Sequence, residues 1–148
     1  MFGTRDSGIE GKSGTEYKFM STIKSYRELR VWQNAMNITQ TIYELTRQFP
    51  SDEKYGLVSQ IRRAAVSIAS NIAEGNGRNT TGEYIHFLGI SRGSLFELET
   101  QIEIASRLGF LSQESHTLLL KDSELISKQL TGLIKSLNAS SGFGTRGS

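Results

Sequence analysis

The sequence predicts a small all-helical protein, and three observations support this prediction. Apolar residues recur every three or four positions in four successive segments, which is the period of an amphipathic helix. No segment shows the sustained alternation of apolar and polar residues that is typical of a strand. The connections between the segments are short, so we expect neighbouring helices to lie antiparallel in an up-down four-helix bundle.

The first predicted helix covers about residues 25–48. Pro50, the only proline in the chain, ends it, because proline lacks an amide hydrogen and restricts the residue before it. The apolar stripe expected to face the core consists of Leu29, Trp32, Met36, Thr39, Ile42, Tyr43, Leu45 and Phe49.

Capping signals delimit the other three helices. The second covers about residues 55–73 and is expected to stop at residues 74–77, where two glycines can adopt positive φ. A capping box at residues 80–83 opens a long third helix, which Gly109 ends. Ser112 is expected to cap the fourth helix. The third helix has the stripe Tyr84, Phe87, Leu88, Ser91, Leu95, Leu98, Ile102, Ala105 and Leu108, and the fourth has Leu118, Leu119, Ile126, Leu130, Leu133 and Leu137.

The bundle is expected to form one domain, residues 23–137, between flexible tails at residues 1–22 and 138–148 that are rich in Gly, Ser and Thr. The chain has no cysteine, which excludes disulfides and thiolate sites. No apolar run approaches the roughly 20 residues that span a bilayer, and no signal peptide is evident. We therefore expect a cytoplasmic protein that makes no contact with a membrane.

The second helix is apolar or small on more than one side. Its stripe toward the core is expected to be Ile61, Ala64, Ala65, Ile68 and Ile72. A second set, Val66, Ala69 and Ala73, is displaced around the helix, and its small side chains would let another backbone approach closely. A subunit interface explains this second set most simply. The alternative is a helix buried at the centre of a single bundle.

The remaining face of the second helix carries polar and basic side chains. Gln60, Arg63, Ser67, Asn71 and Glu74 recur at spacings of three or four, so they either face a lumen or groove or are simply solvated. The predicted contacts for nucleic-acid phosphates are Arg62, Arg63 and Arg78, because forked guanidinium groups suit phosphate oxygens. Alternatively, Arg62 and Arg63 form salt bridges with Glu97, Glu99 or Glu103 of another subunit.

The charge distribution gives modest support to nucleic-acid binding. The whole chain has a net charge of +2. Residues 20–92 contain nine Lys and Arg against six Asp and Glu, a net charge of +3, whereas residues 93–137 contain four against six, a net charge of −2. This asymmetry fits an electrostatic footprint, but it also fits ordinary solvated faces.

No motif in the sequence supports catalysis. Glu83 and His86 form the Glu-x-x-His element that di-iron bundles use, but His116, the other histidine, has no acidic residue three positions before it. Nucleophile-elbow, P-loop and dinucleotide-binding patterns are absent. We expect a protein that is not an enzyme and that has no metal or cofactor.

Four segments carry a resemblance to a known family. They are Tyr26-Arg-Glu-Leu-Arg-Val-Trp-Gln33, Tyr55-Gly-Leu-Val-Ser-Gln-Ile-Arg-Arg-Ala-Ala-Val-Ser-Ile68, Ser70-Asn-Ile-Ala-Glu-Gly75 and Gly93-Ser-Leu-Phe-Glu-Leu-Glu-Thr-Gln101. Over about residues 25–137 the chain resembles the four-helix bundle proteins encoded in 23S rRNA intervening sequences. The resemblance implies a homopentameric ring. It also implies a relationship to accessory proteins of diversity-generating retroelements, which bind RNA and a reverse transcriptase.

Together these points lead to one functional expectation and one alternative. We expect a non-enzymatic homo-oligomer that binds nucleic acid, RNA in preference to DNA, through a basic surface repeated around the ring. The alternative is a scaffold that binds a protein partner and has no role with nucleic acid.

Overall fold

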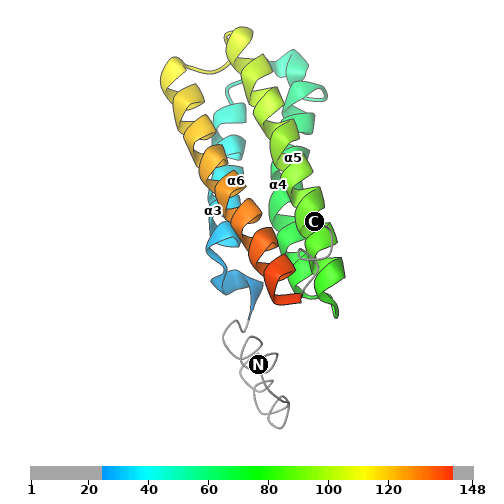
Figure 1. Ribbon diagram of the computed structural model, residues 1–148. Coiled ribbons are helices and arrows are strands. Elements are labelled where there is room, and N and C mark those ends of the chain that lie inside the picture. The colour runs from blue at the N-terminus through cyan, green and yellow to red at the C-terminus, as the bar shows by residue number, and fades with distance from the viewer. Residues whose placement is uncertain (1–24, 142–148) are drawn as a thin grey trace.

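The computed structural model describes residues 25–141 and confirms an all-helical chain with four long helices. These are α3 (Arg30–Thr46), α4 (Leu57–Asn76), α5 (Thr81–Arg107) and α6 (Gln113–Ser141), and no strand occurs in this part of the chain. Two short 3-10 helices, η2 (Tyr26–Glu28) and η3 (Ser51–Glu53), precede α3 and α4. Successive long helices run antiparallel, and α6 closes the bundle against α3 (Figure 1). An amide contact, Asn34 Nδ2 to Gln129 Oε1 at 3.0 Å, joins these two helices.

The predicted starts of the third and fourth helices are confirmed by their caps. The Thr80 hydroxyl accepts a hydrogen bond from the backbone amide of Glu83 at 3.1 Å, and the Ser112 hydroxyl accepts one from the amide of Ser115 at 3.1 Å. These side chains satisfy backbone donors that have no partner within the helix. Gly109, with φ of 82°, follows α5 and turns the chain toward α6.

Three predicted boundaries differ from the structure. Ser25 caps η2 instead of a long helix, so α3 begins only at Arg30. Helix α4 does end within the expected stop at residues 74–77, but it continues past residue 73 to Asn76, where Gly77 is its C-cap and none of these residues has positive φ. Helix α6 extends beyond residue 137 to Ser141, into the expected C-terminal tail. Residues 1–22 and 142–148 of the predicted tails lie outside the described residues.

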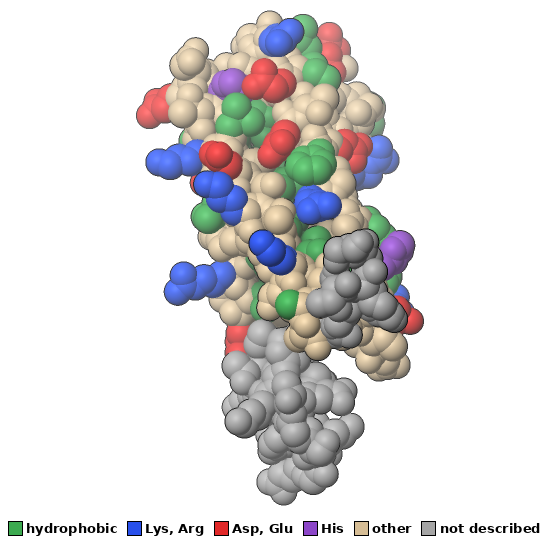
Figure 2. All heavy atoms as spheres, in the orientation of Figure 1, with side chains coloured by type: hydrophobic (Ala, Val, Ile, Leu, Met, Phe, Trp, Pro, Cys, Tyr) green, Lys and Arg blue, Asp and Glu red, His purple; other side chains and the backbone are tan. Residues whose placement is uncertain are grey.

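The outer surfaces of α5 and α6 carry both basic and acidic side chains, with isolated hydrophobic ones between them (Figure 2). No helix in residues 25–141 has the length and apolar character that a bilayer crossing requires.

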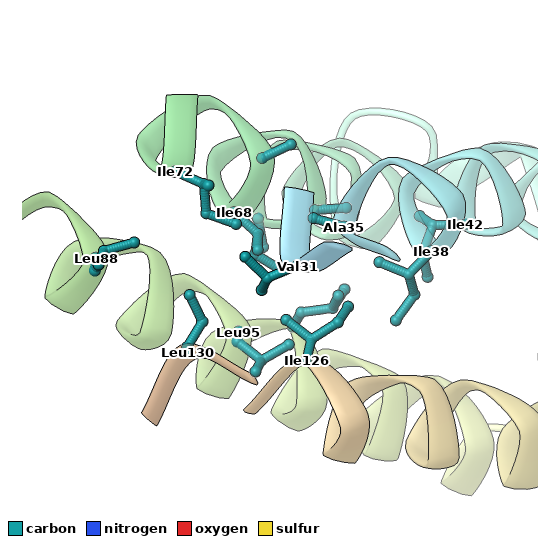
Figure 3. Packing of buried hydrophobic residues seen from close by; sticks show 14 of the residues in the cluster. Val31, Ala35, Ile38, Ile42, Ile68, Ile72, Leu88, Leu95, Ile126 and Leu130 are labelled. Atoms are coloured by element: carbon teal, nitrogen blue, oxygen red, sulfur yellow. The ribbon is translucent and has the colours of Figure 1, made fainter. Parts of the chain in front are cut away.

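The core lies along the axis of the bundle and receives side chains from all four helices (Figure 3). Each fully buried aliphatic side chain contributes about 1.5–3 kcal/mol relative to exposure. The predicted core stripe of α4 is confirmed in full. The largest side chains with almost no exposed surface are Ile38, Ile42, Ile61, Ile68, Ile72, Leu88, Leu95, Leu98, Ile102, Leu119, Ile126 and Leu130.

The predicted core stripe of the first helix is partly wrong. Met36 and Tyr43 keep 45% and 38% of their surface exposed, and Trp32 is half-buried. Leu29, Ile42 and Phe49 are buried as predicted, and the inward positions that the prediction missed are Val31, Ala35, Ile38 and Thr46. Leu108 and Leu118, both expected in the core, are also exposed. In α3 two apolar stripes fit a helix equally well, and packing against the neighbouring helices selects the one with the smaller side chains.

Helices α4 and α5 make the most extensive contact in the bundle. Near the turn that joins them, a Cβ built on Gly75 would lie 2.9 Å from Phe87 Cβ and 3.1 Å from the carbonyl oxygen of Tyr84. Farther along, the buried Ser91 hydroxyl donates to the carbonyl of Ile68 at 2.8 Å. Small residues therefore set the distance between these two helices.

We expect Gly75→Ala to destabilise the fold by about 1–3 kcal/mol, because the added methyl group would force α4 and α5 apart. The control is Gly89→Ala, also within a helix, where a Cβ would meet no atom within 4 Å. The control should stabilise the protein by about 0.5–1 kcal/mol through the higher helix propensity of alanine. Urea unfolding followed by circular dichroism measures both values. An alanine at position 75 that stabilised the protein as much as one at position 89 would contradict the steric argument.

Candidate functional site

Arg62, one of the three arginines predicted to contact phosphate, packs against α3. Its Nε donates to the hydroxyl of Thr46 at 2.9 Å, and a terminal nitrogen donates to the carbonyl of Tyr43 at 3.4 Å. The guanidinium carbon lies 4.5 Å from the centre of the Tyr43 ring. The hydrogen bonds and the cation–π contact together hold the Arg62 side chain against α3 of its own subunit.

Arg63 is one residue further along α4 and has a different environment. Its side chain is exposed and makes no hydrogen bond or ion pair with any residue in the described part of the chain. Consecutive positions on a helix point about 100° apart, so Arg62 faces α3 while Arg63 lies on the outer surface of α4.

Arg78 follows the end of α4 and is held by neighbours in the same subunit. Its guanidinium group forms an ion pair with Glu74 at 2.6 Å and lies 4.6 Å from the centre of the Phe87 ring. Both partners of the ion pair are substantially exposed, so this pair contributes at most about 1 kcal/mol to stability. The structure therefore separates the three predicted arginines, and Arg63 alone among them lacks a partner within residues 25–141.

A groove of about 550 Å³ runs over the outer surface of α4. Helix α4 forms its floor, Tyr43 of α3 lies on one wall, and Ser94 and Glu97 of α5 lie on the other. Glu97 and Arg63 both border the groove without forming an ion pair. The full lining consists of Tyr43, Gln60, Arg63, Ala64, Val66, Ser67, Ser94 and Glu97.

The predicted polar stripe of α4 is only partly open to solvent. The hydroxyls of Ser67 and Ser94 lie 2.8 Å apart across the helix pair. Asn71 Nδ2 donates to the carbonyl and to the hydroxyl of Ser67, at 2.9 and 3.0 Å. Part of the stripe therefore forms a hydrogen-bonded seam with α5, while Gln60, Arg63 and Glu74 remain exposed.

The residues predicted to form a subunit interface have unequal exposure. Val66 is 42% exposed and Ala73 is half-buried, but Ala69 is buried in the core of its own bundle. The Thr39 hydroxyl, 3.2 Å from the carbonyl of Ala65, fixes the antiparallel register of α3 against α4. We call the adjoining apolar residues of these two helices the α3/α4 face: Trp32, Met36, Tyr43, Val66 and Ala73.

The sequence interpretation missed Met36 and Tyr43 as members of the α3/α4 face, because it assigned them to the core. Trp32, also assigned to the core, is half-buried and packs against the core cluster. A competing stripe of apolar residues in the same helix, which includes Val31, Ala35 and Ile38, was the available signal. Where one helix carries two apolar stripes, one of them must face something other than its own core.

The acidic residues of α5 point in different directions. Glu97 borders the groove, whereas Glu99 accepts a hydrogen bond from Ser123 of α6. Glu103 lies 2.6 Å from Nε2 of His116, also on α6. The described residues contain no group of three or more His, Asp or Glu side chains placed to hold a metal ion.

Tyr84 is a buried titratable group at the base of α5. Burial raises the pKa of its phenol above the ordinary value of 10.0, and the hydrogen bond that Asn76 Nδ2 donates at 3.1 Å partly opposes this effect. The phenol therefore stays neutral at physiological pH and joins the end of α4 to the start of α5.

We expect the two adjacent arginines to differ sharply in their contribution to stability. Arg62→Ala should lower the free energy of unfolding by about 1–2 kcal/mol, because it removes hydrogen bonds and the packing against Tyr43. Arg63→Ala, the matched control, should change it by less than about 0.5 kcal/mol. Urea unfolding measures both. Equal effects of the two substitutions would contradict the contacts that distinguish them.

Comparisons with known proteins agree with this architecture. The family described as 23S rRNA-intervening sequence protein matches residues 27–132. A crystal structure of a protein with unknown function from the S23 ribosomal protein family of Bacteroides thetaiotaomicron is similar to this chain, with 25% sequence identity and a TM-score of 0.66. The similarity covers 71% of this chain and 95% of that one. The comparison with curated proteins gives no match. Because the family match spans most of the helical bundle, the chain belongs to the 23S rRNA-intervening sequence protein family.

Proposed function

We propose that this protein is a non-enzymatic homo-oligomer, a pentameric ring in the cytoplasm, that binds RNA through a basic surface repeated once per subunit. The observation that carries the proposal is the state of Arg63. Its exposed guanidinium group borders a groove and has no partner within the described part of its own subunit. Guanidinium groups bind phosphate oxygens through paired hydrogen bonds, so an unpaired Arg63 is suited to an RNA backbone.

The α3/α4 face supports the assembly. Met36, Tyr43 and Val66 are large apolar side chains that are each more than one-third exposed, on two helices that lie side by side. Adjoining exposed apolar side chains favour burial against another protein surface, whereas scattered ones do not. A second copy of the chain is the partner we propose, because closed homo-oligomers are the commonest assemblies of soluble proteins.

Repetition would strengthen RNA binding that is weak for one subunit. A ring presents the same cation at every subunit, and linked contacts raise the overall affinity without any new kind of interaction. The family name refers to intervening sequences of 23S rRNA, and the related structure is described as a protein with unknown function. The relationship to retroelement accessory proteins that the sequence resemblance implies is compatible with RNA binding, as an analogy at the level of the fold.

The groove also favours a second candidate function, a scaffold for a protein partner. Its lining combines apolar surface from Tyr43 and Val66 with two opposite charges, Arg63 and Glu97. A helix with one apolar stripe could lie in such a groove. The response to salt separates the two candidates, because phosphate contacts release counterions and apolar contacts do not.

We expect the purified protein to have a mass that is a multiple of its 16.4 kDa chain. Val66→Glu should shift the mass toward the monomer, because a carboxylate on the α3/α4 face cannot be buried without a partner. The control is Phe96→Glu, which places the same charge at an exposed apolar position on α5. Light scattering after gel filtration gives the masses. A monomeric wild-type protein at micromolar concentration would refute the assembly.

Binding to structured RNA should weaken steeply as salt is added. Each phosphate contact should contribute about 0.7–0.9 to the slope of the logarithm of the binding constant against the logarithm of the salt concentration. Arg63→Ala should reduce the affinity and the slope while the oligomer stays intact. Arg47→Ala, which removes an exposed charge at the end of α3, is the control and should have little effect. Fluorescence anisotropy over a salt series measures these values. The absence of binding even at low salt would favour the protein scaffold.

A further inference from the structure

We infer that the outer surface of α6 forms a second phosphate-contact surface, one that binds the backbone of duplex RNA through Lys121, Lys128 and Lys135. We call these three residues the lysine row. The inference rests on the proposed function, RNA binding, and adds three contacts on a helix that the arginine-based prediction did not include.

The spacing of the lysine row places its members on one side of α6. They are seven residues apart, which is close to two helical turns, so successive members lie roughly 10.5 Å apart along the helix axis. All three side chains are exposed. Figure 2 shows basic and acidic side chains on the surface that faces the viewer. The row is therefore a line of three ammonium groups about 21 Å long.

The acidic residues near this line form no ion pair with it in the described part of the chain. Glu99 and Glu103 of α5 face α6, but there they meet Ser123 and His116 instead of lysine. Within residues 25–141 no ion pair involves a member of the lysine row, and the exposed Glu124, one turn from Lys121 and from Lys128, forms none with them. The three ammonium groups therefore have no carboxylate in direct contact, although α6 also carries Glu114, Asp122 and Glu124.

The residues around the lysine row leave space for the backbone of an RNA duplex to approach it. Thr131 and Gly132 lie between Lys128 and Lys135 and are exposed, and a Cβ at Gly132 would meet no atom within 4 Å. No aromatic residue occurs between Lys121 and Lys135, so the row offers no platform on which unpaired bases could stack. Evenly spaced ammonium groups on a helix suit the regularly repeated phosphates of an RNA duplex.

The lysine row and Arg63 can be tested separately. Helix α4 contacts α3 and α5, and α6 contacts the same two helices, so α4 and α6 occupy opposite corners of the bundle. Removing the charges of one surface leaves the geometry of the other unchanged.

The experiment compares two variants that each lose three positive charges. The first is Lys121→Gln, Lys128→Gln and Lys135→Gln combined. The second, the control, combines Arg47→Gln, Lys54→Gln and Arg107→Gln, which are exposed and lie near the turns at one end of the bundle (Figure 1). The probe is a blunt-ended RNA duplex, and anisotropy is measured over a salt series. A third variant changes the row to arginine and retains its charge.

We expect the row variant to bind at least about tenfold more weakly, with a logarithmic salt slope shallower by about 3 for each engaged subunit. The control should lose less than about threefold, and the arginine variant should bind like the wild type. Surface substitutions of this kind leave stability within about 0.5 kcal/mol, which circular dichroism and light scattering verify for each variant.

Two results would overturn the inference, and they are distinguishable. If the wild type binds the duplex and the row variant matches the control, the inference fails and the proposed function stands. If the wild type does not bind RNA at low salt, both fail. Phosphatidylserine vesicles serve as a parallel probe: binding to vesicles alone, lost in the row variant, would identify the row as a contact for an anionic membrane surface and would also refute the inference.

Discussion

The close approach of α4 to α5 is the constraint on which the rest of the structure depends. Gly75 has no side chain to hold the helices apart, and serine hydroxyls at Ser67, Ser91 and Ser94 form hydrogen bonds at the contact without occupying much space. Where the residues of α4 are small, its outer surface forms the floor of the groove between side chains of α3 and α5. The groove is therefore a consequence of helix packing, and Arg63 is accessible because it lies on the outer side of that helix.

Much of the fold could be predicted from the sequence, because its signals are local. The hydroxyls that cap α5 and α6, the glycine after α5 and the core stripe of α4 all depend on a few consecutive residues. The inward side of α3 could not be predicted in the same way. Its two apolar stripes differ only in which one meets the other helices, and that choice depends on contacts distant in sequence.

The candidate site was less predictable, because adjacent residues have unrelated surroundings. Arg62 and Arg63 cannot be distinguished from the sequence alone. In the structure Arg62 contacts Thr46 and Tyr43 of a neighbouring helix, whereas Arg63 is exposed to solvent. The acids of α5 show the same effect. Their charges alone suggest ion pairs with arginine, whereas in the structure Glu99 accepts a hydrogen bond from a serine and Glu103 pairs with a histidine. Side-chain partners across helices thus decide which charges remain free.

The up-down order of the helices also has a consequence for how the chain folds. Each of the contacts α3 with α4, α4 with α5 and α5 with α6 joins segments that are consecutive in sequence. Among the four long helices described, only the seam between α3 and α6, where Asn34 meets Gln129, joins distant parts of the chain, and the short η2 also contacts α4. Such low contact order favours rapid folding. During synthesis the first three helices can pack together before α6 emerges from the ribosome, and the last helix then docks onto a preformed surface.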